Sequence, residues 1–70
     1  MRSVMEKLSE TVRTRRVALR LTQRELADLA GVSERFVRLV EADKESLRLD
    51  KVAAVLDVLG LELHAELKSS

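Results

Sequence analysis

The side chains of this 70-residue chain that could act on a ligand are mainly charged ones, 13 Lys/Arg and 12 Asp/Glu, together with one histidine, His64. There is no cysteine, so neither a disulfide nor a Cys-based zinc site can form. One histidine cannot hold a structural metal by itself. No nucleophile, base and acid stand together as a catalytic set, and no phosphate loop is present. We therefore expect a protein that is not an enzyme and uses no cofactor.

The charged residues are unevenly distributed, although the formal net charge is only +1. Residues 1–38 hold nine Lys/Arg against five Asp/Glu, a charge of +4, and residues 39–70 hold four against seven, a charge of −3. Unless it arose by chance, this asymmetry indicates a surface that binds an anion. No run approaches the ~18 apolar residues of a membrane span, and the N-terminus lacks the apolar segment of a signal peptide. The expected location is therefore cytoplasmic, without a membrane partner.

Apolar spacing and capping residues predict where the first two helices lie. Apolar residues at intervals near 3.6 predict a helix over Ser3–Leu19. Thr22 followed by Glu25 is a capping box, so a second helix begins there, and Gly31 ends it. The residues of this second helix that we expect to point inward are Leu26, Leu29 and Ala30.

The second half of the chain predicts two more helices and a strand. Ser33 is another N-cap residue, and it begins a helix over Glu34–Glu41. After a polar turn, helical spacing resumes over Leu49–Leu59, and Gly60 ends it. Over Leu61–Leu67 apolar and polar residues alternate, a period of two that predicts a strand with one apolar face.

The stretch from Thr22 to Glu41 therefore holds two short capped helices joined by a tight turn. Ala27 lets the second helix cross close to the first, and Gly31 supplies the positive φ that the turn requires. Two helices joined in this way can place the second one in the major groove of DNA. The same spacing also fits a helical hairpin that binds no ligand.

Several segments carry a family resemblance: Leu21-Thr22-Gln23-Arg24-Glu25-Leu26-Ala27, Leu29-Ala30-Gly31-Val32-Ser33 and Val55-Leu56-Asp57-Val58-Leu59-Gly60. Together they resemble the Cro/phage-repressor helix-turn-helix family over about residues 8–60. The ending, Leu49-Asp50-Lys51-Val52 with Leu59-Gly60-Leu61-Glu62-Leu63, is more narrowly similar to HipB-type antitoxins. Seventy residues suffice for one domain only, residues 1–70, and the resemblance implies that it is all-α. It would be a four-helix repressor-like helix-turn-helix domain with a short C-terminal β-strand, residues 61–67, that pairs between subunits.

The resemblance also implies roles for individual residues. Base edges would be read by Glu34, Arg35, Arg38 and Leu39. An arginine at such a position can hold guanine O6 and N7 with two parallel hydrogen bonds, and a glutamate can accept one from a cytosine amino group. Contacts to DNA phosphates would come from Gln23, Arg13, Arg15, Arg20, Arg24 and Ser33.

Other positions have a structural interpretation. Arg16 would form a charge-assisted bond with Glu41 that ties the reading helix to the first helix. Phe36, the only aromatic residue, is expected to pack rather than to contact a base. Leu39 would contact a thymine methyl group or be a stray exposed leucine. Where the family commonly has glycine, this chain has Arg20 and Asp43, and Asp tolerates a left-handed conformation better than Arg.

The predicted C-terminal strand needs a partner, since a lone strand leaves backbone groups unpaired and 70 residues build only a small core. In a homodimer, the same segment of a second chain would supply the partner strand and would also enlarge the core. A register centred on Leu63 sets Glu62 opposite His64, whereas one centred on His64 sets Glu62 opposite Glu66, so we favour the first. The apolar face would consist of Leu61, Leu63, Ala65 and Leu67.

These expectations describe a sequence-specific transcriptional repressor that binds a near-palindromic operator in double-stranded DNA. The narrower similarity implies the autoregulating antitoxin of a HipA-like kinase toxin. Two alternatives are a stand-alone helix-turn-helix regulator and a protein-interaction module that does not bind DNA.

Overall fold

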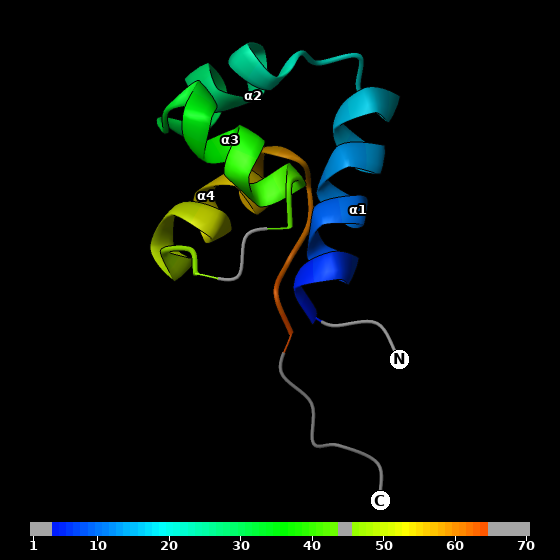
Figure 1. Ribbon diagram of the computed structural model, residues 1–70. Helices are drawn as coiled ribbons and strands as arrows, with labels where there is room; N and C mark the ends of the chain where they lie inside the picture. The colour runs from blue at the N-terminus through cyan, green and yellow to red at the C-terminus, as the bar shows by residue number, and fades with distance from the viewer. Residues whose placement is uncertain (1–3, 44–45, 65–70) are drawn as a thin grey trace, which may run out of the picture.

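The computed structural model of the protein describes residues 4–43 and 46–64, and these residues form four α-helices. The helices are α1 (Val4–Ala18), α2 (Gln23–Ala30), α3 (Glu34–Glu41) and α4 (Leu49–Val58) (Figure 1). The predicted four-helix, all-α architecture is confirmed over these residues, and each helix begins and ends within one residue of its expected position.

Side chains cap the first turns of α2 and α3, as the sequence predicts. The Thr22 hydroxyl accepts a hydrogen bond from the Glu25 amide at 3.0 Å, and the Glu25 carboxylate accepts one from the Thr22 amide at 2.8 Å. Hydrogen bonds to the Glu25 carboxylate, first from the Thr22 amide and then from the Thr22 side chain, lower the pKa of Glu25. The Ser33 hydroxyl accepts from the Phe36 amide at 3.0 Å. These bonds satisfy amides that have no acceptor within their own helix.

Each helix is followed by a residue with positive φ: Arg20 (59°), Gly31 (71°), Asp43 (63°) and Gly60 (72°). After Arg20, Gly31 and Gly60, the next amide donates to the carbonyl five residues earlier at 2.8–3.1 Å. This bond is the mark of a Schellman motif, which satisfies carbonyls at the end of a helix. Arg20 and Asp43 therefore take the backbone conformation that favours glycine, as the comparison with the family pattern suggested.

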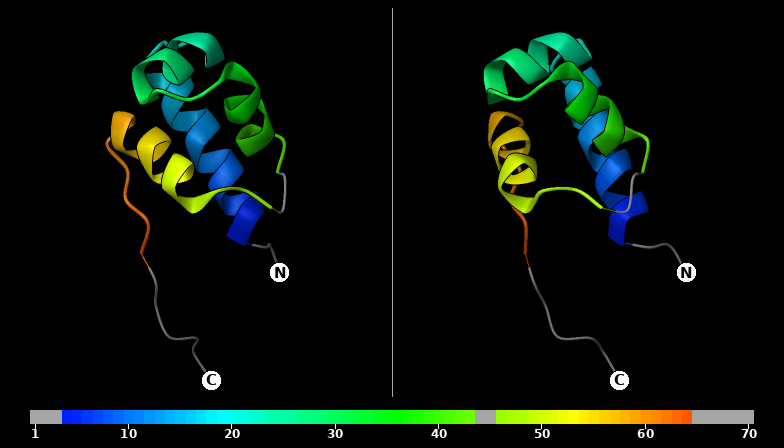
Figure 2. Two further views of the ribbon diagram at one scale, coloured as in Figure 1. Left: turned by 90° about the vertical axis from the view of Figure 1, so that its left-hand side faces the viewer. Right: turned by 60° about the vertical axis from the view of Figure 1, so that its left-hand side comes forward.

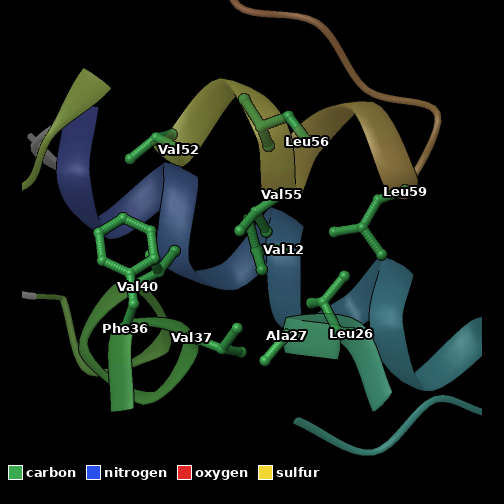
Figure 3. Close-up of a cluster of buried hydrophobic side chains, with 10 residues drawn as sticks. All are labelled: Val12, Leu26, Ala27, Phe36, Val37, Val40, Val52, Val55, Leu56 and Leu59. Atoms are coloured by element: carbon green, nitrogen blue, oxygen red, sulfur yellow. The ribbon is translucent and has the colours of Figure 1, made fainter. Parts of the chain in front are cut away.

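One cluster of buried apolar side chains joins the four helices, as Figure 3 shows. Ala27 of α2 is only 1% exposed and lies beside Val37 of α3, so its small side chain permits close packing there. Phe36 packs in the cluster, as expected, and the Lys51 ammonium lies 5.9 Å from its ring centroid, within cation–π range. The buried members are Val12, Leu26, Ala27, Phe36, Val37, Val40, Val52, Val55, Leu56 and Leu59.

The expectation that Leu29 points inward is wrong, because its exposed fraction is 64%. The core-facing side of α2 is formed by Leu26, Ala27 and Ala30. At about 100° per residue, Leu29 lies roughly 100° around the helix from the middle of that face. Its side chain therefore projects into solvent.

The packing leaves one side of α3 uncovered. α2 packs against both α3 and α4, and α1 packs against α3. In both views of Figure 2, α3 lies at the periphery of the molecule with α1 behind or beside it. The core is therefore built on one face of α3, and the other face is available for a ligand.

Residues 61–64, which follow α4, form no strand in the structure. Leu61 packs partly against the core, whereas Leu63 is 47% exposed. Ala65 and Leu67, the other two residues of the predicted apolar face, lie outside the described residues. A strand requires a neighbouring strand with which to exchange backbone hydrogen bonds, and residues 4–43 and 46–64 contain none.

Arg20→Gly is expected to raise the free energy of unfolding by about 1 kcal/mol, because a left-handed conformation is unfavourable for most L residues but not for glycine. Urea denaturation measures the change. Asp43→Gly serves as the control, and its gain should be smaller because Asp tolerates this conformation better than Arg. If Arg20→Gly lowers the stability, the Arg20 backbone is not strained.

Candidate nucleic-acid interface

An ion pair between α1 and α3 anchors the C-terminal end of α3. The Arg16 guanidinium donates two hydrogen bonds to the Glu41 carboxylate, from Nε to Oε2 at 2.7 Å and from Nη2 to Oε1 at 3.0 Å. The two side chains are 13% and 3% exposed, and the hydrogen bond to Glu41 raises the pKa of Arg16. Because an unpartnered buried charge is strongly unfavourable, this pair fixes where α3 ends relative to α1.

Two further side chains lie close to the Glu41 carboxylate. Nε2 of Gln23, the first residue of α2, donates to Glu41 Oε1 at 3.2 Å, and Arg13 Nε lies 3.9 Å from that oxygen. Arg16 also donates from Nη1 to the carbonyl of Leu21 at 2.7 Å, in the turn between α1 and α2. We name this set the polar hub; it consists of Arg13, Arg16, Gln23 and Glu41. The hub joins α1, the start of α2 and the end of α3.

α3 has one buried and one exposed face. Phe36, Val37 and Val40 lie in the core. On the other side Arg35 and Arg38 are exposed, whereas Glu34 and Leu39 are partly exposed. The structure thus brings the side chains predicted to read bases onto the solvent side of one short helix. We name this set the reading face; it consists of Glu34, Arg35, Arg38 and Leu39.

Most of the residues predicted to contact phosphates lie near the α1–α2 turn or at helix starts. Arg20 lies in that turn, Arg24 lies in the first turn of α2, and both are exposed together with Arg13. Gln23 belongs to the polar hub, and Ser33 caps α3. The first turns of α2 and α3 carry backbone amides and the positive end of the helix dipole, which favour an anion.

Arg15 is the predicted phosphate-binding residue that the structure does not bring together with the others. Its Nε donates a hydrogen bond of 2.9 Å to the carbonyl of Leu59, at the end of α4. The last carbonyls of a helix lack partners within the helix, and a cation there also interacts favourably with the helix dipole. Arg15 therefore holds α4 against α1.

Sequence reasoning missed three of these contacts: Gln23 with Glu41, Arg13 with Glu41, and Arg15 with Leu59. Each joins residues at least 18 positions apart, so no local spacing signals it. It also missed the ion pair between Glu34 and Arg38, for which a signal did exist. Opposite charges four residues apart on a helix lie on the same face and attract each other.

Two capped helices, a tight turn at Gly31 and a polar exposed face on the second helix together define a helix-turn-helix unit, a class of DNA-binding module. A family model described as helix-turn-helix matches residues 12–65 of the chain. The protein therefore belongs to this helix-turn-helix family, whose members are DNA-binding regulators and are generally not enzymes.

The described residues offer neither a membrane-spanning helix nor a cluster of metal-binding side chains. None of the four helices is long and apolar enough to cross a membrane. Within residues 4–43 and 46–64, no three His, Cys, Asp or Glu side chains are grouped so that they could hold a metal ion. The polar surface that remains to be explained is the reading face and its flanks.

Glu41→Ala is expected to lower the free energy of unfolding by about 3 kcal/mol or more, because it leaves Arg16 buried without its partner. A double-mutant cycle with Arg16→Ala should show a coupling energy above ~0.5 kcal/mol. Equilibrium unfolding in urea of the four proteins provides the values.

The control is a second cycle at Arg48 and Asp50, whose atoms Nη2 and Oδ2 also approach to 2.8 Å but whose side chains are 69% and 65% exposed. Water weakens such a pair, so its coupling should be the smaller of the two. Strictly additive effects at Arg16 and Glu41 would mean that the hub does not hold α3 in place.

Proposed function

We propose that this protein is a sequence-specific transcriptional repressor that reads its operator with α3. The observation that carries the proposal is the reading face, held in place by the polar hub. In the major groove, Arg35 and Arg38 would each hold a guanine, and Glu34 would accept a hydrogen bond from a cytosine amino group. Leu39 would contact a thymine methyl group.

Contacts to the DNA backbone would position this helix. The exposed cations near the α1–α2 turn and the amides at the starts of α2 and α3 suit phosphate oxygens, which carry no sequence information. Since Arg15 is bonded to Leu59, we assign it to the packing of α4 rather than to phosphate. The residues that we propose for phosphate are Gln23, Arg13, Arg20, Arg24 and Ser33.

We further propose that the repressor is a homodimer. A groove of about 410 Å³ is lined by side chains of α1, α4 and residues 61–64. The C-terminal segment of a second copy would cover Leu63 and enlarge the small core, with the two segments paired as strands. Two α3 helices related by a two-fold axis would then reach half-sites of a near-palindromic operator about 34 Å apart, or a multiple of that. The pairing residues would be Leu61, Leu63, Ala65 and Leu67.

The similarity of residues 49–63 to HipB-type antitoxins supports a narrower role, that of an autoregulating antitoxin of a HipA-like kinase toxin. A stand-alone regulator would bind the operator but no kinase. Co-expression with a kinase encoded next to this gene, followed by size-exclusion chromatography, distinguishes the two. A stable complex of both chains supports the antitoxin, and separate elution at micromolar concentration supports the stand-alone regulator.

Arg35→Ala and Arg38→Ala should each weaken operator binding by about 1–3 kcal/mol and relax the preference at one base pair, because each removes a bidentate guanine contact. Arg13→Ala should weaken all duplexes about equally, since a phosphate contact is independent of sequence. Selection from a random duplex pool, followed by affinity measurements on the selected and on unrelated duplexes, tests these statements. If the wild type selects no inverted repeat, or if both α3 variants keep its full preference, the proposed reading of DNA is wrong.

Leu63→Asp should convert the dimer to a monomer, because it buries two like charges near the two-fold axis. Sedimentation equilibrium gives the oligomeric state directly. Leu29→Asp is the matched control: Leu29 is exposed on α2 and does not line the groove, so its variant should remain a dimer. A wild type that is monomeric at micromolar concentration would rule out the proposed assembly.

A further inference from the structure

The reading face carries one negative charge, Glu34, beside the two positive charges of Arg35 and Arg38. Glu34 lies one helical turn before Arg38, and Glu34 Oε2 is 3.4 Å from Arg38 Nη1. The two side chains are 42% and 57% exposed, so water reaches both. A carboxylate at this place opposes the approach of phosphates, yet it contacts one of the two arginines of the same face.

The environment of this pair differs from that of the polar hub. Glu41 is almost fully buried and has several hydrogen-bond donors around it. Separating it from these donors would therefore strongly lower the stability of the fold. The pair of Glu34 and Arg38 is open to solvent and is correspondingly weak. It can therefore separate when DNA offers each side chain a better partner.

We propose that Glu34 is a specificity-determining residue that acts by rejecting DNA without a matching cytosine. In the free protein it holds the Arg38 guanidinium on the reading face. On the operator, Arg38 exchanges this partner for guanine O6 and N7, and Glu34 accepts a hydrogen bond from a cytosine amino group. On other duplexes the carboxylate finds no donor, is repelled by the phosphates and keeps Arg38 from reaching them. This inference rests on the proposed function.

Helix geometry limits where the two bases lie. Four residues of α-helix advance by about 6 Å, and stacked base pairs are about 3.4 Å apart. The guanine read by Arg38 and the cytosine read by Glu34 are therefore expected within about two base pairs of each other in each half-site. The sequences of selected operators show directly how many base pairs separate this guanine from this cytosine.

Glu34→Gln tests the proposal, because it removes the charge and keeps the size of the side chain. Affinity for random duplex should rise about two- to five-fold, as expected for the loss of one exposed repulsive charge. The preference for cytosine at one position should be lost or replaced by adenine, which glutamine can bind through N6 and N7. The ratio of operator to random-duplex affinity should then fall about five-fold or more.

Two further variants separate this effect from a general change in charge. Asp57→Asn removes the same charge from an exposed position of α4, and it should leave the operator preference unchanged. In a protein that already carries Arg38→Ala, Glu34→Gln should raise random-duplex affinity less than it does in the wild type. The reason is that no Arg38 side chain is there to be released from Glu34. Circular dichroism verifies that each variant is folded.

Failure of the role of Glu34 and failure of DNA binding give different results. Suppose that the wild type selects an operator, and that Glu34→Gln, like Asp57→Asn, leaves the ratio of operator to random-duplex affinity unchanged. The proposed role of Glu34 is then wrong and the proposed function stands. If the wild type binds no duplex at any salt concentration, the proposed function itself fails and this inference fails with it.

Discussion

The buried ion pair between Arg16 and Glu41 is the constraint on which the arrangement of the helices depends. Burial of an ionised pair is unfavourable unless good geometry and additional hydrogen bonds compensate for lost hydration. Here the compensation comes from different elements: Arg16 lies on α1, and Gln23 begins α2. All of these bonds form together only when the end of α3 meets both helices in one geometry.

The apolar core and the polar hub contribute differently to the position of α3. Burial of Val37 and Val40 removes apolar surface from water, a favourable effect that depends little on direction. The hydrogen bonds to Glu41 depend strongly on distance and angle, so a shift of α3 along its axis would break them. The core thus keeps α3 attached and decides which of its residues point outward, and the hub fixes the position of α3 along its axis.

Features set by neighbouring residues could be predicted from the sequence, and features set by distant ones mostly could not. Thr22 and Ser33 cap their helices through residues three positions away, so the starts of α2 and α3 were predictable. The inward direction assigned to Leu29 was wrong, because the four apolar residues of α2 span about 160° of the helix and the core covers only part of that arc. The exception among distant contacts, Arg16 with Glu41, was anticipated from family resemblance alone.

The division of α3 into two faces has a consequence for how such regulators diversify. Residues such as Arg35 and Arg38 lie outside the core, and surface substitutions typically alter stability by less than about 0.5 kcal/mol. Mutation can therefore explore new binding preferences at these positions while the fold stays intact. After gene duplication, two copies of this protein could come to control separate genes through a few substitutions on α3. Each intermediate sequence would still fold.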